Sequence, residues 1–257
     1  MVKAAATQPP EGGDAMSHRE FSDPFSLGER DPEFAALFAN FAFDEAARQG
    51  ELDGATRMLA VLAALLGCGG HDCFADLVPD ALDAGLTPVQ LKEVAYQATA
   101  YLGLGRTLPF LRALNEALFK EGVPLPLPGQ STTAAETRRE AGTAAQVAIF
   151  GEGMTDFWRS GPEESRHINR WLAANCFGDY YTRTGLDLRQ RELITFCFLA
   201  AQGGCEPQLK SHIAANLRLG TGRHTLIAAL STALPYIGYP RSLNALRCIQ
   251  EAAAPQK

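Results

Sequence analysis

The sequence lacks the features that mark membrane, secreted and nucleic-acid-binding proteins. Its longest apolar run, around Met58 to Gly67, is about half of the roughly 18–20 residues that a membrane-spanning helix needs. The first residues hold one lysine and no apolar core, so we expect no signal peptide. The formal net charge is −6, whereas nucleic acids and anionic membranes are bound by clusters of Lys and Arg. We therefore expect a cytoplasmic protein that binds neither nucleic acid nor membrane.

The sequence has few cysteines, and their spacing matches no paired-cysteine motif. None of the six cysteines forms a CxxC motif or a paired zinc-ligand spacing. In a cytoplasmic protein most of them are expected to be reduced and buried as small apolar residues. Cys68, His71 and Cys73 lie too close together in one loop to make a good tetrahedral site. We expect no metal and no cofactor.

Alternating strand patterns are also missing, and the segments that remain have helix signals. Asp53 and Asp187 stand at N-cap positions ahead of the long apolar stretches RMLAVLAALLG and RELITFCFLAA. Glycine pairs end both stretches, and Thr87 followed by Pro88 starts a further helix. A chain with 46% hydrophobic and 20% charged residues has the composition of a globular protein. The sequence predicts an all-α fold.

The chain is internally duplicated. Asp53 aligns with Asp187 at an offset of 134, and after the glycine pair one inserted residue makes the offset 135. Matches along this register include Phe43/Phe177, Arg57/Arg191, Leu65/Leu199, Gly85/Gly220, Tyr101/Tyr236, Arg106/Arg241 and Glu116/Glu251. The sequence therefore predicts a disordered tail over 1–24, a first repeat over 25–122, a Pro-rich linker over 123–133 and a second repeat over 134–257.

The segment GGCEPQLKSHIAANL carries the first candidate residues. Its glycines break one helix and Pro207 restarts another, which places Cys205 at a helix N-terminus, where a thiolate is stabilised. Cys205, Gln208 and His212 are spaced as i, i+3 and i+7, on one helix face, so the thiol and the imidazole could exchange a proton. The alternative, which spacing alone favours, is a buried thiol beside a histidine that binds a carbonyl group.

Three further residues are candidates. Glu192 could relay protons to His212 if their two helices pack antiparallel, or it is an ordinary carboxylate in the first turn of its helix. Arg241 could bind a substrate carboxylate or form a structural ion pair. Tyr236 is expected to line the interior. The first repeat has Met58 in the place of Glu192 and Leu77 in the place of His212, so we interpret it as structural.

The motif LDLRQRELITFCFLAAQGGCEPQLKSHIAANLRLG with LPYIGYPRSLNAL, and more weakly the corresponding first-repeat segments, resembles the carboxymuconolactone decarboxylase family, which includes alkylhydroperoxidase D-like proteins. The resemblance extends from about residue 34 to 252. It implies two tandem alkylhydroperoxidase D-like helical repeats. It also implies a homo-oligomer, with a trimer of tandem chains carrying six units.

The same resemblance implies alternative chemistries. Peroxidase-type members use a Glu, a CxxC and a His; Glu192, Cys205 and His212 match, but Gln208 occupies the second Cys position. The resemblance to decarboxylase-type members implies cofactor-free proton transfer on a small organic acid or lactone. His212 would then be the base or acid and Glu192 would tune it, while Cys205, Gln208, Tyr236 and Arg241 would contribute to the pocket. The alternatives are a peroxiredoxin-like antioxidant that uses Cys205, and a non-catalytic helical scaffold or small-ligand binder.

Overall fold

The computed structural model describes residues 23–252, so the predicted tail over 1–24 lies almost wholly outside the described residues. Within that range the chain forms helices and turns and contains no strand, which confirms the all-α prediction. The first repeat contributes α1 (Pro32–Ala39), η1 (Asn40–Ala46), α2 (Gly54–Cys68), α3 (His71–Asp76), α4 (Val78–Asp83), α5 (Pro88–Leu102) and α6 (Leu104–Lys120). The second contributes α7 (Arg138–Phe150), η2 (Glu152–Met154), η3 (Phe157–Arg159), α8 (Arg166–Trp171), η4 (Leu172–Tyr181), α9 (Leu188–Gln202), α10 (Glu206–Arg218), α11 (Arg223–Ile237) and α12 (Tyr239–Ala252).

The long helices begin where the sequence places their caps. Asp53 accepts a hydrogen bond from the Thr56 amide and starts α2. Asp187 starts α9 with a capping box, in which its side chain and that of Gln190 each bind the other residue's backbone amide. These contacts satisfy amides that have no partner inside the helix. They fix the first turn of the two helices that form the centre of the protein.

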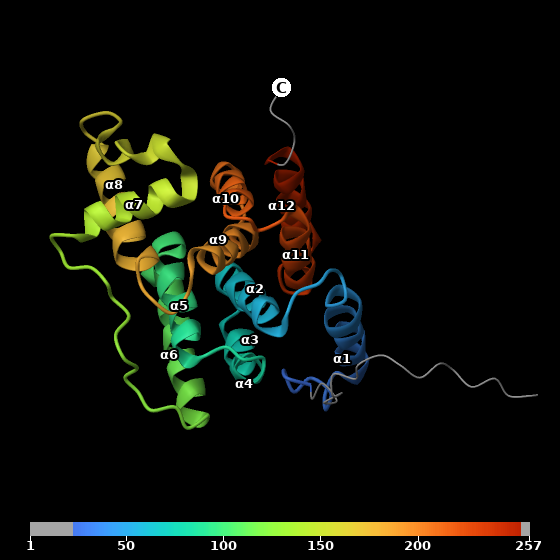
Figure 1. The fold of residues 1–257 in the computed structure, drawn as a ribbon. Coiled ribbons are helices and arrows are strands. Elements are labelled where there is room, and N and C mark those ends of the chain that lie inside the picture. The colour runs from blue at the N-terminus through green and yellow to red at the C-terminus, as the bar shows by residue number, and fades with distance from the viewer. Residues whose placement is uncertain (1–22, 253–257) are drawn as a thin grey trace, which may run out of the picture.

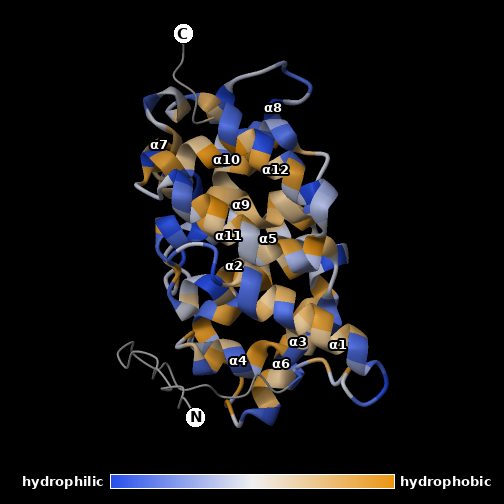
Figure 2. Cartoon of the chain, turned by 90° about the vertical axis from the view of Figure 1, so that its right-hand side faces the viewer, coloured by the Kyte–Doolittle hydropathy of each residue, from blue (hydrophilic) through white to orange (hydrophobic). Residues whose placement is uncertain are grey.

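Helices α2 and α9 are the equivalent central helices of the two repeats, and they pack directly on each other. Gly67 of α2 allows this close approach, because a Cβ atom there would lie 2.6 Å from the carbonyl oxygen of Phe198 and 2.7 Å from the Cβ atom of Ala201. The largest group of buried apolar residues surrounds this pair. Figure 2 shows hydrophobic residues concentrated on the middle helices, with hydrophilic residues toward the loops. The two repeats therefore share one core.

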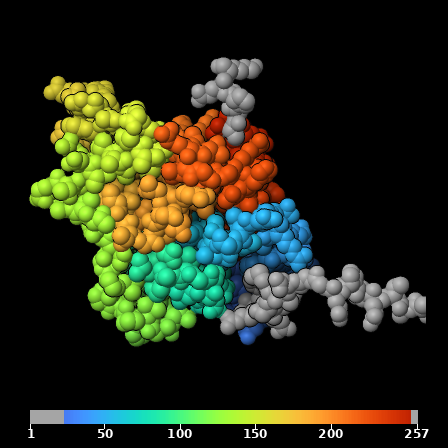
Figure 3. Space-filling model, viewed as in Figure 1, coloured from blue at the N-terminus to red at the C-terminus, as the bar shows by residue number. Residues whose placement is uncertain are grey.

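Each repeat also packs a later helix against the other repeat. Helix α5 of the first repeat contacts α9 of the second, and α11 of the second repeat contacts α2 of the first. Figure 1 shows α2 and α9 at the centre of the molecule, and Figure 3 shows the two halves of the chain in broad contact. Side chains from one repeat can therefore reach the central helix of the other.

A long connection joins the repeats. The predicted linker over 123–133 lies in the non-helical stretch between α6 and α7 and runs along one side of the molecule (Figure 1). Thr132 and Thr133 donate side-chain hydrogen bonds to the carbonyl oxygens of Thr182, at 2.8 Å, and Gly178, at 3.1 Å. These bonds hold the connection against the second repeat. Among the described residues, no helix is long and apolar enough to cross a membrane.

Candidate acid/base site in the second repeat

The first feature of the site is a buried pair between α9 and α10. The short Gly203–Cys205 connection folds α10 back onto α9, and Nδ1 of His212 then lies 2.7 Å from Oε2 of Glu192. The Asn216 amide donates at 2.9 Å to the backbone carbonyls of both Glu192 and His212, which fixes their relative position. The proximity that the sequence predicted for these two residues is therefore present.

The charge state of Glu192 decides the tautomer of His212. With Glu192 ionised, its carboxylate only accepts hydrogen bonds, and the proton between the two groups lies on Nδ1 of the imidazole. In the neutral ring this leaves a free lone pair on Nε2. The His212 side chain is 9% exposed, whereas that of Glu192 is 0% exposed. Of the two side chains, only that of His212 retains some exposed surface.

The second carboxylate oxygen of Glu192 is bound by a cluster of hydroxyl groups. Tyr181 donates to Oε1 of Glu192 at 2.8 Å. The Tyr181 hydroxyl in turn lies 2.8 Å from that of Thr195 and 2.7 Å from that of Tyr101. Tyr181 comes from η4, Thr195 from α9 and Tyr101 from α5 of the first repeat. The site is therefore built by both repeats.

Burial keeps the groups around the pair neutral. It raises the pKa of the Tyr101 and Tyr181 hydroxyls well above the ordinary range, and the carboxylate of Glu192 adds to this effect. Burial also raises the pKa of the Cys176 thiol to about 12. At neutral pH these three side chains are uncharged and retain protons that they can donate.

Aromatic rings flank the imidazole on two sides. The rings of Tyr101 and Phe150 each meet His212 edge to face, with centroids 5.4 Å away. Phe150 belongs to α7, which approaches η4 closely through Gly142 and Gly178. These rings flank the imidazole with apolar surface, beside which a hydrogen bond to Glu192 is stronger than it would be in water.

Cys205 lies apart from this pair. It is the N-cap residue of α10 with a non-helical backbone (φ −137°, ψ 38°), and it lines a cavity whose lining does not include His212. Its thiol donates to the Leu199 carbonyl at 3.5 Å. Burial raises the pKa of the Cys205 thiol, and the nearby carboxylate of Glu206 raises it further. The sequence predicts that the helix N-terminus stabilises a Cys205 thiolate, whereas burial and the like charge of Glu206 act in the opposite direction.

The other predicted residues lie outside the His212 pair. Cys205 and Arg241 line one small cavity between α9, α10 and α12, and His212 is not part of its lining. Gln208 is exposed on α10. Tyr236 packs on the ring of Phe38 in the first repeat, with centroids 5.8 Å apart, and burial raises the pKa of its hydroxyl. Of the six predicted site residues, the structure therefore pairs Glu192 with His212, places Cys205 and Arg241 at a separate small cavity, and leaves Gln208 and Tyr236 outside both groups.

The residues that sequence reasoning missed are Gln97, Tyr101, Tyr181 and Thr195. A comparison of the two repeats contains a signal for two of them, because the offset of 134 aligns Tyr181 with Ala47 and Thr195 with Val61. Polar side chains thus occur in the second repeat at buried positions where the first repeat has apolar ones. Buried polar side chains at positions that are apolar in the other repeat indicate a functional site in the second repeat.

Comparisons with known proteins agree with this architecture. The model of the carboxymuconolactone decarboxylase family matches residues 32–116 and again residues 167–251. A solved structure from Burkholderia xenovorans LB400, provisionally named a gamma-carboxymuconolactone decarboxylase subunit, is similar with a TM-score of 0.54 and 24% sequence identity over 90% of each chain. No curated protein matches the sequence. The two matched segments cover most of the chain, which therefore belongs to the carboxymuconolactone decarboxylase family as a tandem of two repeats.

Proposed function

We propose that the protein is a cofactor-free carboxy-lyase in which His212 transfers a proton to or from a small organic acid or lactone. The observation that carries this proposal is the 2.7 Å hydrogen bond between Nδ1 of His212 and the buried carboxylate of Glu192. A carboxylate that binds one ring nitrogen fixes the imidazole and stabilises the positive charge that it gains as a base.

The chemistry follows from the free ring nitrogen. Nε2 of His212 removes the proton of the carboxyl group that is to be lost, so that the electron pair of its O–H bond stays on the carboxylate, and the imidazolium that forms is stabilised by Glu192. Loss of carbon dioxide leaves an electron pair on the adjacent carbon, and the same imidazolium returns its proton there. The proton and electron pair thus balance without an external cofactor. Membership in the family supports the substrate class.

The thiol-dependent alternative has less support from the site. Cys205 has a raised pKa, and the pKa of Cys197 on α9 is raised to about 12 by burial. The thiolate is the nucleophilic form of cysteine, so both side chains are poorly activated at neutral pH. A peroxidase reaction would require a Cys205 thiolate, whereas the surroundings of Cys205 favour the neutral thiol.

Two variants separate these functions. The native chain is incubated with a panel of small carboxylated lactones and organic acids, and release of carbon dioxide is measured. We expect turnover to fall at least about a hundredfold in His212→Gln, the typical contribution of a general acid or base, and to persist in Cys205→Ser. Consumption of a peroxide with an external thiol that is lost in Cys205→Ser would overturn the proposal. Absence of both activities in the native chain would favour a scaffold or ligand-binding role.

We also propose that the chain assembles as a homotrimer that presents six repeats. Large apolar residues are exposed at equivalent positions of the two repeats. With the offsets of 134 and 135 they are Phe34/Ile168, Leu37/Trp171, Leu104/Tyr239 and Leu108/Leu243. Exposed apolar residues that cluster in patches mark contact surfaces. Their recurrence in both repeats fits an assembly in which every repeat makes the same contacts.

A further inference from the structure

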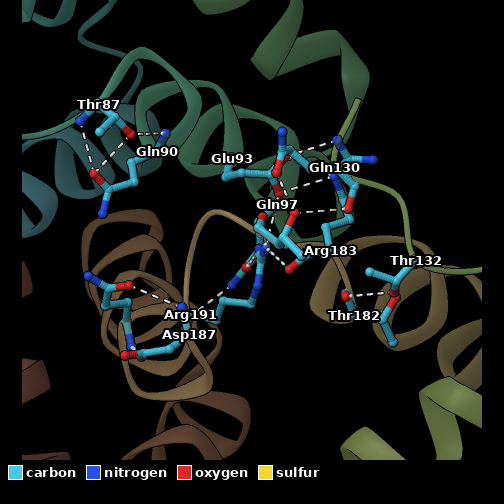
Figure 4. Close-up of polar contacts among 12 residues, drawn as sticks. Thr87, Gln90, Glu93, Gln97, Gln130, Thr132, Thr182, Arg183, Asp187 and Arg191 are labelled. Carbon is cyan, nitrogen blue, oxygen red and sulfur yellow. Dashed lines mark hydrogen bonds and ion pairs between the residues drawn. The ribbon is translucent and has the colours of Figure 1, made fainter. Parts of the chain in front are cut away.

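A buried glutamine of the first repeat connects the site to a buried arginine. Gln97 lies on α5 and is 0% exposed. Its Oε1 atom accepts from Nη1 of Arg191 at 2.8 Å, and its Nε2 atom donates to the Thr195 hydroxyl at 2.9 Å. Figure 4 shows Gln97 among the charged groups at this contact between the repeats. The glutamine therefore joins Arg191 to the hydroxyl cluster beside Glu192.

The bonds in this chain have one direction. Arginine can only donate, so the oxygen of the Gln97 amide must face Arg191 and its nitrogen must face Thr195. Thr195 accepts from Gln97, which leaves its own proton for the Tyr181 hydroxyl. The Tyr181 hydroxyl donates a hydrogen bond to the carboxylate of Glu192, which in its ionised form can only accept. Tyr101, 2.7 Å from Tyr181, donates to the same hydroxyl. At each of these links the donor lies on the side away from Glu192, whereas the second amide hydrogen of Gln97 goes to the backbone carbonyl of Arg191 at 2.9 Å.

The charged end of the chain is held in place by two further residues. Glu93 of α5 binds Arg191 at 3.0 Å and Arg183 at 2.9 Å (Figure 4). Both Arg191 and Glu93 have almost no exposed surface. Arg191 also donates to the Arg183 carbonyl at 2.8 Å. A buried guanidinium with a paired charge and fixed direction polarises the bonds that start from it.

We infer that the first repeat completes the acid/base site of the second repeat. Gln97 and Tyr101, both on α5, supply donors to a one-way chain through Thr195 and Tyr181 that stabilises the carboxylate of Glu192 and thereby positions His212. These four side chains are positioning residues, because none of them reaches the imidazole nitrogen that would meet a substrate. Their importance for turnover rests on the proposed function. The hydrogen bonds that link them to Glu192 do not depend on that function.

The first repeat has no equivalent chain. The offset of 135 aligns Gln97 with Thr232 and Tyr101 with Tyr236, but Tyr236 has Phe38 as its ring neighbour. Arg57, the counterpart of Arg191, donates to the backbone carbonyls of Ala47 and Leu52 instead of to a glutamine. The duplication therefore provides a matched control residue for Tyr101, which is Tyr236.

The inference is tested by the protonation of His212 without any substrate. Nitrogen-15 NMR of histidine-labelled protein follows the ring nitrogens against pH, and His212→Gln assigns the signals. Glu192 with a neutral His212 carries one net negative charge, and the donors offset the cost of burying it. When a donor is lost, uptake of a proton by the pair becomes more favourable, so the pH midpoint of His212 protonation must rise. The other ionisable groups that face the pair, Tyr101, Tyr181 and Cys176, are neutral over this range.

We expect Tyr181→Phe to raise the midpoint by about one pH unit, the effect of one hydrogen bond to a charged group. Tyr101→Phe is expected to raise it less, and Tyr236→Phe to leave it unchanged. Thr195→Val provides a second, isosteric interruption and is expected to shift it in the same direction. An unchanged or lowered midpoint in Tyr181→Phe and Thr195→Val would overturn the inference, and so would an equal shift in Tyr236→Phe. This titration contains no substrate, so it is independent of the proposed function. If the proposed function fails and the inference holds, the shifts in the His212 midpoint are observed although the native chain shows no turnover.

Discussion

His212 and Glu192 form a buried hydrogen bond of 2.7 Å between Nδ1 and Oε2, across two helices that are joined by a short turn. Only the histidine retains some exposure. The carboxylate is enclosed by donors, and the imidazole is flanked by the rings of Tyr101 and Phe150. The first repeat has Met58 and Leu77 at the equivalent positions, so the second repeat carries this pair and the first does not.

The buried ion pair between Arg191 and Glu93 predicts that replacing Arg191 lowers the free energy of unfolding more than replacing its first-repeat counterpart, Arg57. Arg191→Met leaves the buried carboxylate of Glu93 with Arg183 alone, so we expect the free energy of unfolding to fall by about 3–5 kcal/mol. The control, Arg57→Met, removes donors only from backbone carbonyls and is expected to cost about 1–2 kcal/mol. Urea unfolding monitored by circular dichroism measures the free energy of unfolding of both variants. Equal losses would contradict the role of Arg191 as the buried partner of Glu93.

The contact of α7 with η4 predicts that Gly142 cannot be enlarged. A Cβ atom there would lie 1.9 Å from the Ala173 carbonyl oxygen and 2.6 Å from the Gly178 amide nitrogen. Gly142→Ala is therefore expected to lower the free energy of unfolding by about 1–3 kcal/mol or more. Gly105→Ala is the control, because a Cβ atom on Gly105 meets nothing within 4 Å; this change should be neutral or slightly stabilising. Thermal melting compares the two, and a harmless Gly142→Ala would show that the helices separate easily.

The buried Cys176 thiol predicts a loss of stability in alkali. Its pKa is raised from 9.0 to about 12 in the folded chain. The unfolded state therefore releases its proton first as the pH rises, and stability declines between about pH 9 and pH 12. This thiol alone accounts for about 1.4 kcal/mol per pH unit within that window. Below pH 9 it contributes no dependence on pH. In Cys176→Ala the decline measured by urea unfolding should be shallower by that amount, whereas an unchanged slope would place the thiol in contact with solvent.

The exposed apolar positions predict an assembly that depends on Trp171 and Leu37. Sedimentation velocity of the native chain should give about three times the mass of one 27.6 kDa chain. Trp171→Asp and Leu37→Asp introduce a charge at equivalent exposed positions and are expected to shift the protein toward the monomer. A native chain that sediments as a monomer at all concentrations would contradict the proposal.

The sequence predicts the fold well because its signals are local. Asp53, Asp187 and Thr87 cap helices where the sequence places them, and the repeat follows from a constant register. Glu192 and His212 could be paired for the same reason, since a short turn joins their helices. These features depend on residues near one another in the chain.

The rest of the site depends on tertiary packing that the sequence does not display. Tyr101 and Gln97 reach the second repeat only because α5 crosses to α9, about 100 residues further along the chain. The sequence predicts that Cys205 shares a face with His212, but Cys205 has a non-helical N-cap backbone and lines a cavity that His212 does not line. Helical spacing describes a side chain only where the backbone is helical.

The ring nitrogens of His212 in the native protein provide the most direct measurement of the central claim. Nitrogen-15 NMR at a pH where the ring is neutral should show a protonated Nδ1, bound to Glu192, and an unprotonated Nε2 that is free to act as a base. In Glu192→Gln this preference for one tautomer should be lost or reduced. A neutral His212 with its proton on Nε2 in the native protein would contradict the role of Glu192 and the assignment of His212 as the base.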